Sequence, residues 1–221
     1  MDSEETALRE KMVEVMRAMD ERGLNRGTSG NICARLGPDM LVTPSGVPPQ
    51  RLTPELMVRI GPAGEIADGQ AKPSSEWRMH HAILALRPDA GAVVHCHSRH
   101  ATILACAGRP IPPVHYMVAV SGGPSVPVAP YATFGSEALA QSVVQTLAGR
   151  RAALMANHGQ IALGPNLDLA LLVAEEIEEQ AAVYWGCLAI GGPKLLDDGQ
   201  MAEIGQAFAR YGQTPKAGSK A

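Results

Sequence analysis

Residues 92–98, AVVHCHS, end an apolar run with two histidines that are one residue apart. In a β-strand, side chains two positions apart face the same side, so His95 and His97 project together and Cys96 faces away. The apolar run before them predicts that the pair lies at the end of a buried strand. Imidazole is a common zinc ligand, and a His-x-His pair in a strand favours a metal site over two ordinary polar residues.

The rest of the pattern predicts an α/β domain. Helical spacing of apolar residues alternates with short apolar runs bounded by glycine and proline. Several strands follow one another without a helix between them, which favours a mixed or largely antiparallel sheet over a doubly wound one. The predicted helices cover residues 4–22, 75–87, 99–108, 136–149, 166–192 and 201–212, the second with Ser75 as its N-cap. The predicted strands, hairpins and strand-and-loop pieces lie within 31–36, 40–47, 57–66, 91–98, 114–135 and 151–164.

A third histidine, His158, also follows an apolar run, ALMAN, and precedes a glycine. Together with His95 and His97 it could supply three ligands to a metal that keeps an open, catalytic position. Whether His158 lies close to the pair depends on the fold. His80 shares a helical face with Glu76, four residues earlier, and stays a minor alternative as a ligand.

Three loops place small hydroxyl residues beside glycine or proline: GTSGN (27–31), TPSGV (43–47) and KPSSE (72–76). Such loops expose backbone N–H groups and add hydroxyl donors, which together can hold a phosphate without a lysine. Ser74 and Ser75 also precede a predicted helix, whose N-terminus favours an anion. Taken singly, each stretch is better explained as an ordinary turn.

Composition and charge exclude several classes of protein. The chain of 221 residues is 46% apolar, enough for a sizeable core, and its net charge of −3 comes without the basic patch of a nucleic-acid binder. No apolar run reaches the roughly 18 residues of a membrane span. The N-terminal stretch MDSEETALRE lacks the apolar segment of a signal peptide. Four cysteines without CxxC spacing are typical of reduced thiols, so we expect a cytoplasmic protein.

Read together, the motifs resemble those of the class II aldolase/adducin family. They are GLNRGTSGN, MLVTPSG, KPSSEWRMH, VVHCHS, VHYM, APYATFG, NHG and ARYG. The resemblance runs from about Leu8 to Gly212, and within the family the L-fuculose-1-phosphate aldolases are the most similar group. It implies a three-layer α/β/α sandwich with a central, mostly antiparallel sheet. It also implies one domain over residues 1–212, followed by a flexible tail at 213–221.

The same resemblance implies a role for each matching residue. His95, His97 and His158 would bind zinc, with cobalt or manganese as alternatives, and Glu76 would be the acid/base and a fourth ligand in the resting enzyme. The residues implied to bind the substrate phosphate are Gly30, Asn31, Ser45, Gly46, Ser74 and Ser75. Three residues are implied at the aldehyde half. Tyr116, contributed by a neighbouring subunit, would assist proton transfer. Tyr211 would be catalytic, and together with Phe134 it would shape the pocket. The family's enzymes of this group are C4 homotetramers with sites between subunits.

The implied activity is cleavage of a ketose 1-phosphate to dihydroxyacetone phosphate and an aldehyde, through an enediolate that zinc stabilises. L-Fuculose 1-phosphate, 5-deoxyribulose 1-phosphate and 5-methylthioribulose 1-phosphate differ only at the aldehyde end. The acidic end of the family's C-terminal tail is replaced here by TPKAGSKA, which leaves the choice of aldehyde open. Epimerases, decarboxylases and dehydratases of sugar phosphates in the same family remain alternatives. A non-catalytic, adducin-like scaffold would be expected to lack the full set of histidines, and an unrelated zinc hydrolase would not explain the three loops.

Overall fold

A seven-stranded sheet organises the part of the chain that the computed structural model describes, residues 3–208 and 210. The strands lie in the order β3-β2-β1-β4-β7-β6-β5. Their bounds are β1 (Asn31–Leu36), β2 (Asp39–Val42), β3 (Val58–Ile60), β4 (Ala92–Cys96), β5 (Val128–Ala129), β6 (Ala152–Met155) and β7 (Gly159–Gly164). Only the β5–β6 pair is parallel among the described strand pairs. The prediction of a mostly antiparallel sheet is therefore confirmed.

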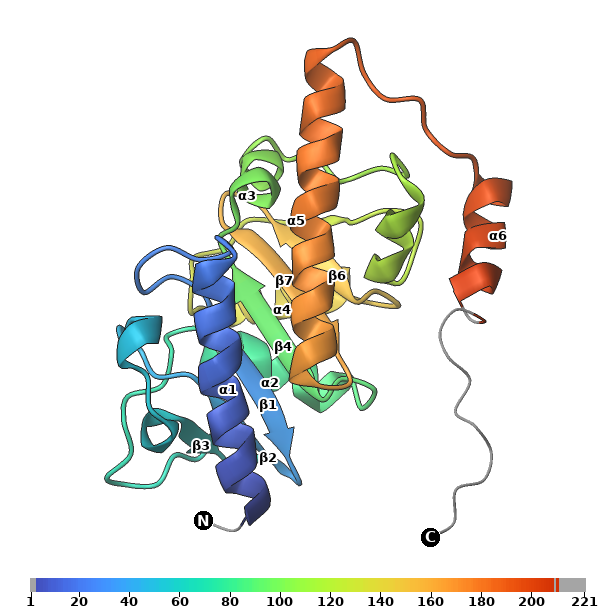
Figure 1. The fold of residues 1–221 in the computed structure, drawn as a ribbon. Helices are drawn as coiled ribbons and strands as arrows, with labels where there is room; N and C mark the ends of the chain where they lie inside the picture. Colours follow the sequence, from blue (N-terminus) through green and yellow to red (C-terminus); the bar gives the residue numbers. More distant parts are fainter. Residues whose placement is uncertain (1–2, 209, 211–221) are drawn as a thin grey trace, which may run out of the picture.

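The helices cover both faces of this sheet. Their bounds are α1 (Ser3–Glu21), α2 (Trp77–Leu86), α3 (Arg99–Cys106), α4 (Glu137–Thr146), α5 (Leu167–Ala189) and α6 (Asp198–Phe208). Short 3₁₀ helices are η1 (Pro49–Arg51), η2 (Pro54–Leu56) and η3 (Tyr116–Ser121). In Figure 1, α1 and α5 cross in front of the sheet, and α2 and α4 lie behind it.

Two hydrophobic cores separate the layers. One joins α1, α3 and α5 to one face of the sheet, and the other joins α2 and α4 to the opposite face. Successive side chains of β4 alternate between them, because Val94 and Cys96 belong to the first core and Val93 to the second. This arrangement confirms the three-layer α/β/α sandwich. It also directs His95, two residues after Val93, towards α2.

Two local predictions are wrong. Ser75 is not the N-cap of α2; Glu76 is, and Ser74 Oγ accepts a hydrogen bond from the Glu76 N–H at 3.3 Å. The segment before α2 is held at Ser74 rather than at Ser75, because the Ser74 N–H donates a hydrogen bond to the Thr43 carbonyl. Part of the segment expected as strand and loop pieces over 114–135 forms η3, in which Val118 and Ser121, three residues apart, share a buried face.

All four cysteines are free thiols, as predicted. No helix in the described part of the chain combines the length and the apolar composition of a bilayer crossing. The expected tail, residues 213–221, lies outside the described residues.

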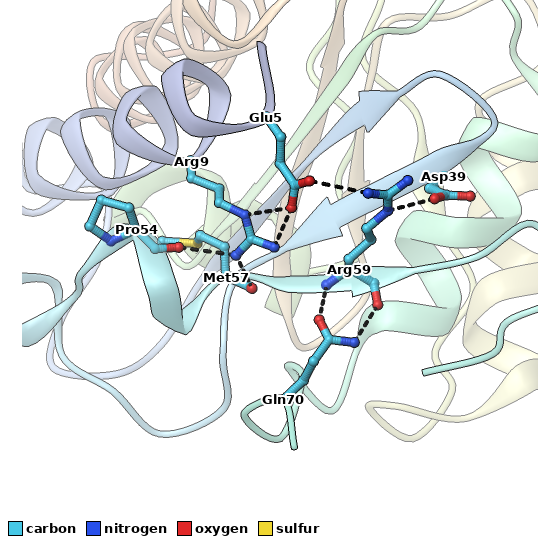
Figure 2. Close-up of polar contacts among 7 residues, drawn as sticks. All are labelled: Glu5, Arg9, Asp39, Pro54, Met57, Arg59 and Gln70. Atoms are coloured by element: carbon cyan, nitrogen blue, oxygen red, sulfur yellow. Dashed lines mark hydrogen bonds and ion pairs between the residues drawn. The ribbon is translucent and has the colours of Figure 1, made fainter. Parts of the chain in front are cut away.

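A buried charge network fastens the start of α1 to the edge of the sheet (Figure 2). Arg9 donates to the Glu5 carboxylate at 2.6 and 2.9 Å and to the backbone carbonyls of Pro54 and Met57 at 3.1 and 2.5 Å. Arg59 of β3 donates to Glu5 at 3.1 Å and to Asp39 of β2 at 2.6 Å. Glu5 and Arg9 are both nearly inaccessible to solvent, so their charges depend on these partners.

We expect Arg9→Ala to lower the free energy of unfolding by about 3 to 5 kcal/mol, because it removes one partner of a buried ion pair. Lys11→Ala, on the same helix, removes only partly exposed pairs with Glu14 and Asp168 and should cost much less. Urea titration of both variants measures the difference. Equal midpoints for the two variants would contradict a structural role for the network.

Candidate metal centre and active site

Antiparallel pairing brings the three predicted metal histidines together. His95 lies near the end of β4, His97 follows that strand, and His158 lies in the turn between β6 and β7. Because Cys96 of β4 pairs with Gln160 of β7, the end of one strand lies beside the start of the other. The three ring centroids are 4.8 to 4.9 Å apart, and one ring nitrogen of each histidine lies within 4.8 Å of the others.

The backbone of the turn that carries His158 restricts which residues can flank that histidine. Asn157 has a φ of +56°, in the left-handed region that asparagine tolerates better than most residues. At Gly159, a Cβ atom would lie 2.4 Å from the Cys96 carbonyl oxygen and 3.1 Å from the His97 ring. The residues on either side of His158 therefore allow β7 to approach the end of β4 closely.

Hydrogen bonds orient the His95 ring. Its Nδ1 lies 2.8 Å from the Gln160 carbonyl oxygen and so carries a proton, while its Nε2 lies 3.0 Å from His97 Nε2. The Gln160 side chain is held in turn, because its Nε2 donates to Ser98 Oγ at 2.8 Å and to the Ala174 carbonyl at 3.0 Å. The ring thus directs Nε2 towards the other histidines.

Burial and neighbouring charge favour metal binding by the other two histidines. Burial, with a further contribution from His95, lowers the pKa of His97 to about 4 and that of His158 to about 4. Both are neutral at neutral pH and can offer a lone pair. Burial lowers the pKa of His95, but the adjacent Glu76 carboxylate outweighs it and raises that pKa. A metal at this site would need the lone pair of His95 Nε2, while Nδ1 keeps its proton for the Gln160 carbonyl.

Glu76 lies beside this cluster at the N-cap of α2, and it is 5% exposed. Its Oε2 is 3.2 Å from His95 Nε2, and its Oε1 is 3.3 Å from His158 Nε2. Asn31 Nδ2 donates to Oε2 at 2.9 Å. Burial acts to raise the pKa of Glu76, but His95, His158 and this hydrogen bond outweigh it and hold the pKa well below its ordinary value.

These donors fit a tetrahedral divalent metal. Zinc binds imidazole nitrogens at about 2.0 to 2.1 Å, so two ligand nitrogens of one ion lie roughly 3 to 3.5 Å apart. The His95–His97 separation of 3.0 Å approaches that range. Three imidazoles and one adjacent carboxylate form a set in which the carboxylate can leave the metal while the histidines hold it.

The predicted phosphate residues line one cavity of about 320 Å³, together with Glu76, His97 and His158. They are Gly30, Asn31, Ser45, Gly46, Ser74 and Ser75. Backbone hydrogen bonds join the second and third loops, because Ser45 N donates to the Lys72 carbonyl and Ser74 N to the Thr43 carbonyl, both at 2.9 Å. Gly30 has a φ of +79°, and a Cβ there would lie 2.1 Å from the Asn25 side chain, so only glycine fits.

Two aromatic residues form the open rim of the cavity. Phe134 was predicted for the aldehyde half, lines the cavity and is 67% exposed. Tyr131 also lines it and is 65% exposed, and sequence reasoning did not single it out although it lies in the quoted motif APYATFG. The other lining residues that were not predicted individually are Thr28, Ser29, Pro44, Ala132 and Asn157.

Of the two predicted tyrosines, the structure describes only Tyr116. Tyr116, on η3, is half exposed, contacts the rings of His115 and Phe208, and is not among the described residues that line the cavity. Tyr211 lies outside the described residues. His80, the minor alternative ligand, is not part of the histidine cluster.

This geometry agrees with the similarity to known proteins. Residues 10–185 match the family described as Class II Aldolase and Adducin N-terminal domain. The chain belongs to the class II aldolase/adducin family, as the motifs predicted.

Relatives match over nearly the whole chain. The protein is 46% identical over 212 residues to the 5-methylthioribulose-1-phosphate/5-deoxyribulose-1-phosphate aldolase of Rhodospirillum rubrum, covering 96% of each chain. It is 43% identical over 210 residues to an L-fuculose phosphate aldolase of Escherichia coli, covering 95% of this chain and 97% of the relative. A solved L-fuculose 1-phosphate aldolase matches with a TM-score of 0.90 and 34% identity over 95% of this chain and 98% of that one. The predicted enzyme class, a class II aldehyde-lyase, is therefore confirmed.

We expect purified protein to hold a divalent metal that His97→Ala loses, because the variant removes one of three converging imidazoles. His81→Ala is the control, since His81 contacts the Gly61 carbonyl at 3.3 Å and is not in the cluster. Elemental analysis of both variants after equal dialysis measures the bound metal. Retention of metal by His97→Ala at the level of His81→Ala would rule out His97 as a ligand.

Proposed function

We propose that this protein is a metal-dependent aldolase that cleaves a ketose 1-phosphate to dihydroxyacetone phosphate and an aldehyde. One observation carries the proposal: three loops suited to a phosphate line the same cavity as Glu76 and two histidines of the cluster, His97 and His158. A phosphate held by the loops would leave the carbon chain of the substrate extended towards the histidines.

The proposed roles follow from the chemistry of each group. The loops bind the phosphate through backbone N–H and hydroxyl donors. A divalent metal, when bound by His95, His97 and His158, supplies Lewis-acid stabilisation of the negative charge that develops next to the ketone. Zinc is the metal we propose, because it suits three imidazoles, and cobalt or manganese are the alternatives.

Proton transfer is the task of Glu76. As the carbon–carbon bond breaks, the hydroxyl of the aldehyde half loses a proton and a carbon of the dihydroxyacetone phosphate half gains one. Glu76 lies next to the histidines and lines the cavity, so it can deliver the second proton. Its lowered pKa suits a carboxylate that His95, His158 and Asn31 hold ionised until substrate displaces it.

The proton at the aldehyde half is assigned to Tyr116 of a neighbouring subunit, assisted by Tyr211. The half-exposed position of Tyr116, away from the cavity of its own chain, supports this assignment. A C4 tetramer with sites at subunit interfaces is the proposed assembly. The cytoplasmic location, which rests on the scattered free cysteines, remains a prediction.

Three substrates are candidates, since the relatives are named for 5-methylthioribulose 1-phosphate, 5-deoxyribulose 1-phosphate and L-fuculose phosphate. The exposed aromatic rim formed by Tyr131 and Phe134 is compatible with an apolar methyl or methylthio end. L-Fuculose 1-phosphate also ends in a methyl group, but its aldehyde half carries an additional hydroxyl. We therefore propose that the two 5-deoxypentulose phosphates, which lack that hydroxyl, are cleaved better than L-fuculose 1-phosphate.

A coupled assay for dihydroxyacetone phosphate tests the reaction on all three sugars, with and without a chelator. We expect release that the chelator abolishes and added zinc restores. No release from any of the three by metal-loaded protein would refute the aldolase and favour an epimerase, decarboxylase or dehydratase of the same family.

We expect Glu76→Gln to lower kcat by about 10² to 10⁴, the usual contribution of a general acid/base, because glutamine cannot exchange the proton. Glu178→Gln is the control, since Glu178 contacts His100 rather than the cluster. Steady-state kinetics with the best substrate measures the effect. A Glu76→Gln rate within tenfold of the wild type would remove Glu76 from the proton-transfer role.

A further inference from the structure

A fully buried histidine, His80, lies next to the active site but makes no hydrogen bond to His95, His97 or His158. His80 is on α2, one turn after Glu76, and is 0% exposed. Its Nε2 lies 2.5 Å from Asn31 Oδ1. Its Nδ1 has no hydrogen-bond partner among the described residues. A buried polar side chain with one unpaired atom is costly, so its presence requires a reason.

The protonation of His80 follows from this environment. Burial, with a further contribution from the charge of His95, lowers its pKa to about 3, so the ring is neutral and carries a single N–H. The alternative tautomer is unfavourable, because an Nδ1 N–H would have no acceptor and the Nε2 lone pair would face the lone pairs of Asn31 Oδ1. The proton therefore resides on Nε2, where Asn31 Oδ1 accepts it.

This proton fixes the orientation of the Asn31 side chain. With Oδ1 bound to His80, Nδ2 faces Glu76 and donates to Oε2 at 2.9 Å. A flipped amide would put its carbonyl oxygen against the Glu76 carboxylate and would force the His80 proton onto the unpaired Nδ1. Both changes are unfavourable, so His80 selects one of the two amide orientations.

We infer that His80 is a positioning residue, which orients the Asn31 amide so that it anchors one oxygen of Glu76 and leaves the other for chemistry. The inference rests on the proposed role of Glu76 as the acid/base. Oε1, the oxygen that Asn31 does not hold, has no hydrogen-bond partner among the described residues and lies 3.3 Å from His158 Nε2. Among the described residues, hydrogen bonds thus hold the carboxylate at Oε2 only.

The fold fixes the relative positions of the three hydrogen-bonded residues Glu76, Asn31 and His80. Glu76 and His80 are four residues apart and share one face at the start of α2. Asn31 begins β1 and pairs directly with His95 of β4. A one-residue shift of β1 would turn the Asn31 side chain to the other face of the sheet, so the register that brings Asn31 beside His95 also directs it towards α2.

The first test measures the tautomer in metal-free protein and needs no activity. In a sample labelled with ¹⁵N-histidine, we expect the His80 signals, identified by their loss in His80→Gln, to show a protonated Nε2 and an unprotonated Nδ1. A protonated Nδ1 would overturn the inference. This result stands whether or not any ketose 1-phosphate is cleaved, so it separates failure of the inference from failure of the proposed function.

The second test compares His80→Leu, which removes the N–H, with His80→Gln, whose amide can place an N–H donor near the position of Nε2. We expect kcat to fall by about 10- to 100-fold in His80→Leu, the usual effect of losing a supporting hydrogen bond, with KM changed much less. His80→Gln should recover most of the loss, and bound metal should be the same in both. His81→Leu, the adjacent residue on the same helix, should keep the wild-type kcat.

Equal impairment of the leucine and glutamine variants would show that only packing matters at this position and would overturn the inference. Wild-type kcat in the leucine variant would do the same. If the leucine variant does not fold, the glutamine variant still decides, because a kcat as low as that of Glu76→Gln contradicts the inference and a kcat near wild type supports it.

Discussion

The antiparallel pairing of β4 with both β1 and β7 is the constraint on which the site depends. It places Asn31 beside His95 on one side of the central strand and the turn that carries His158 beside its end on the other. Residues that are more than 60 positions apart in the chain thereby meet at one sheet end, where helices on the two faces leave the cavity open. A change of register would turn the affected side chains to the opposite face, so the hydrophobic cores that fix the register also fix the site.

A balance between burial and charge determines the state of the carboxylate. Glu76 is taken almost completely out of water, which on its own would neutralise it, yet two histidines and an amide hold it as an anion. The same burial keeps His97 and His158 neutral. One environment thus keeps the carboxylate ionised and these two imidazoles neutral, which suits the proton carrier and the metal ligands that we propose.

Much of the fold could be predicted because most elements carry local signals. Gly and Pro mark the turns, the Ser136 and Asn166 caps begin α4 and α5 as their side chains suggest, and period-2 spacing placed His95 and His97 on one side. The convergence of His158 could not be derived from the sequence, since it depends on a strand pairing rather than on spacing. The N-cap of α2 was misplaced by one residue because a hydrogen bond from Ser74 to a distant loop decides where that helix begins.

The members of the site that local patterns missed share one physical property: their partners lie on other elements. Tyr131 lines the cavity because its loop packs against the Ser74–Ser75 loop at Gly135. Gly135 has a φ of +72°, and a Cβ atom there would clash with the Ser75 carbonyl oxygen, so glycine permits the close approach. No sequence pattern distinguishes His80 from its neighbour His81. His80 is nevertheless buried against Asn31, whereas His81 contacts the Gly61 carbonyl in a surface loop. In the function that we propose, the closed, hydrogen-bonded side of the cavity would hold the groups common to all candidate substrates. The open aromatic side would then be where substrates that differ only in their aldehyde end are distinguished.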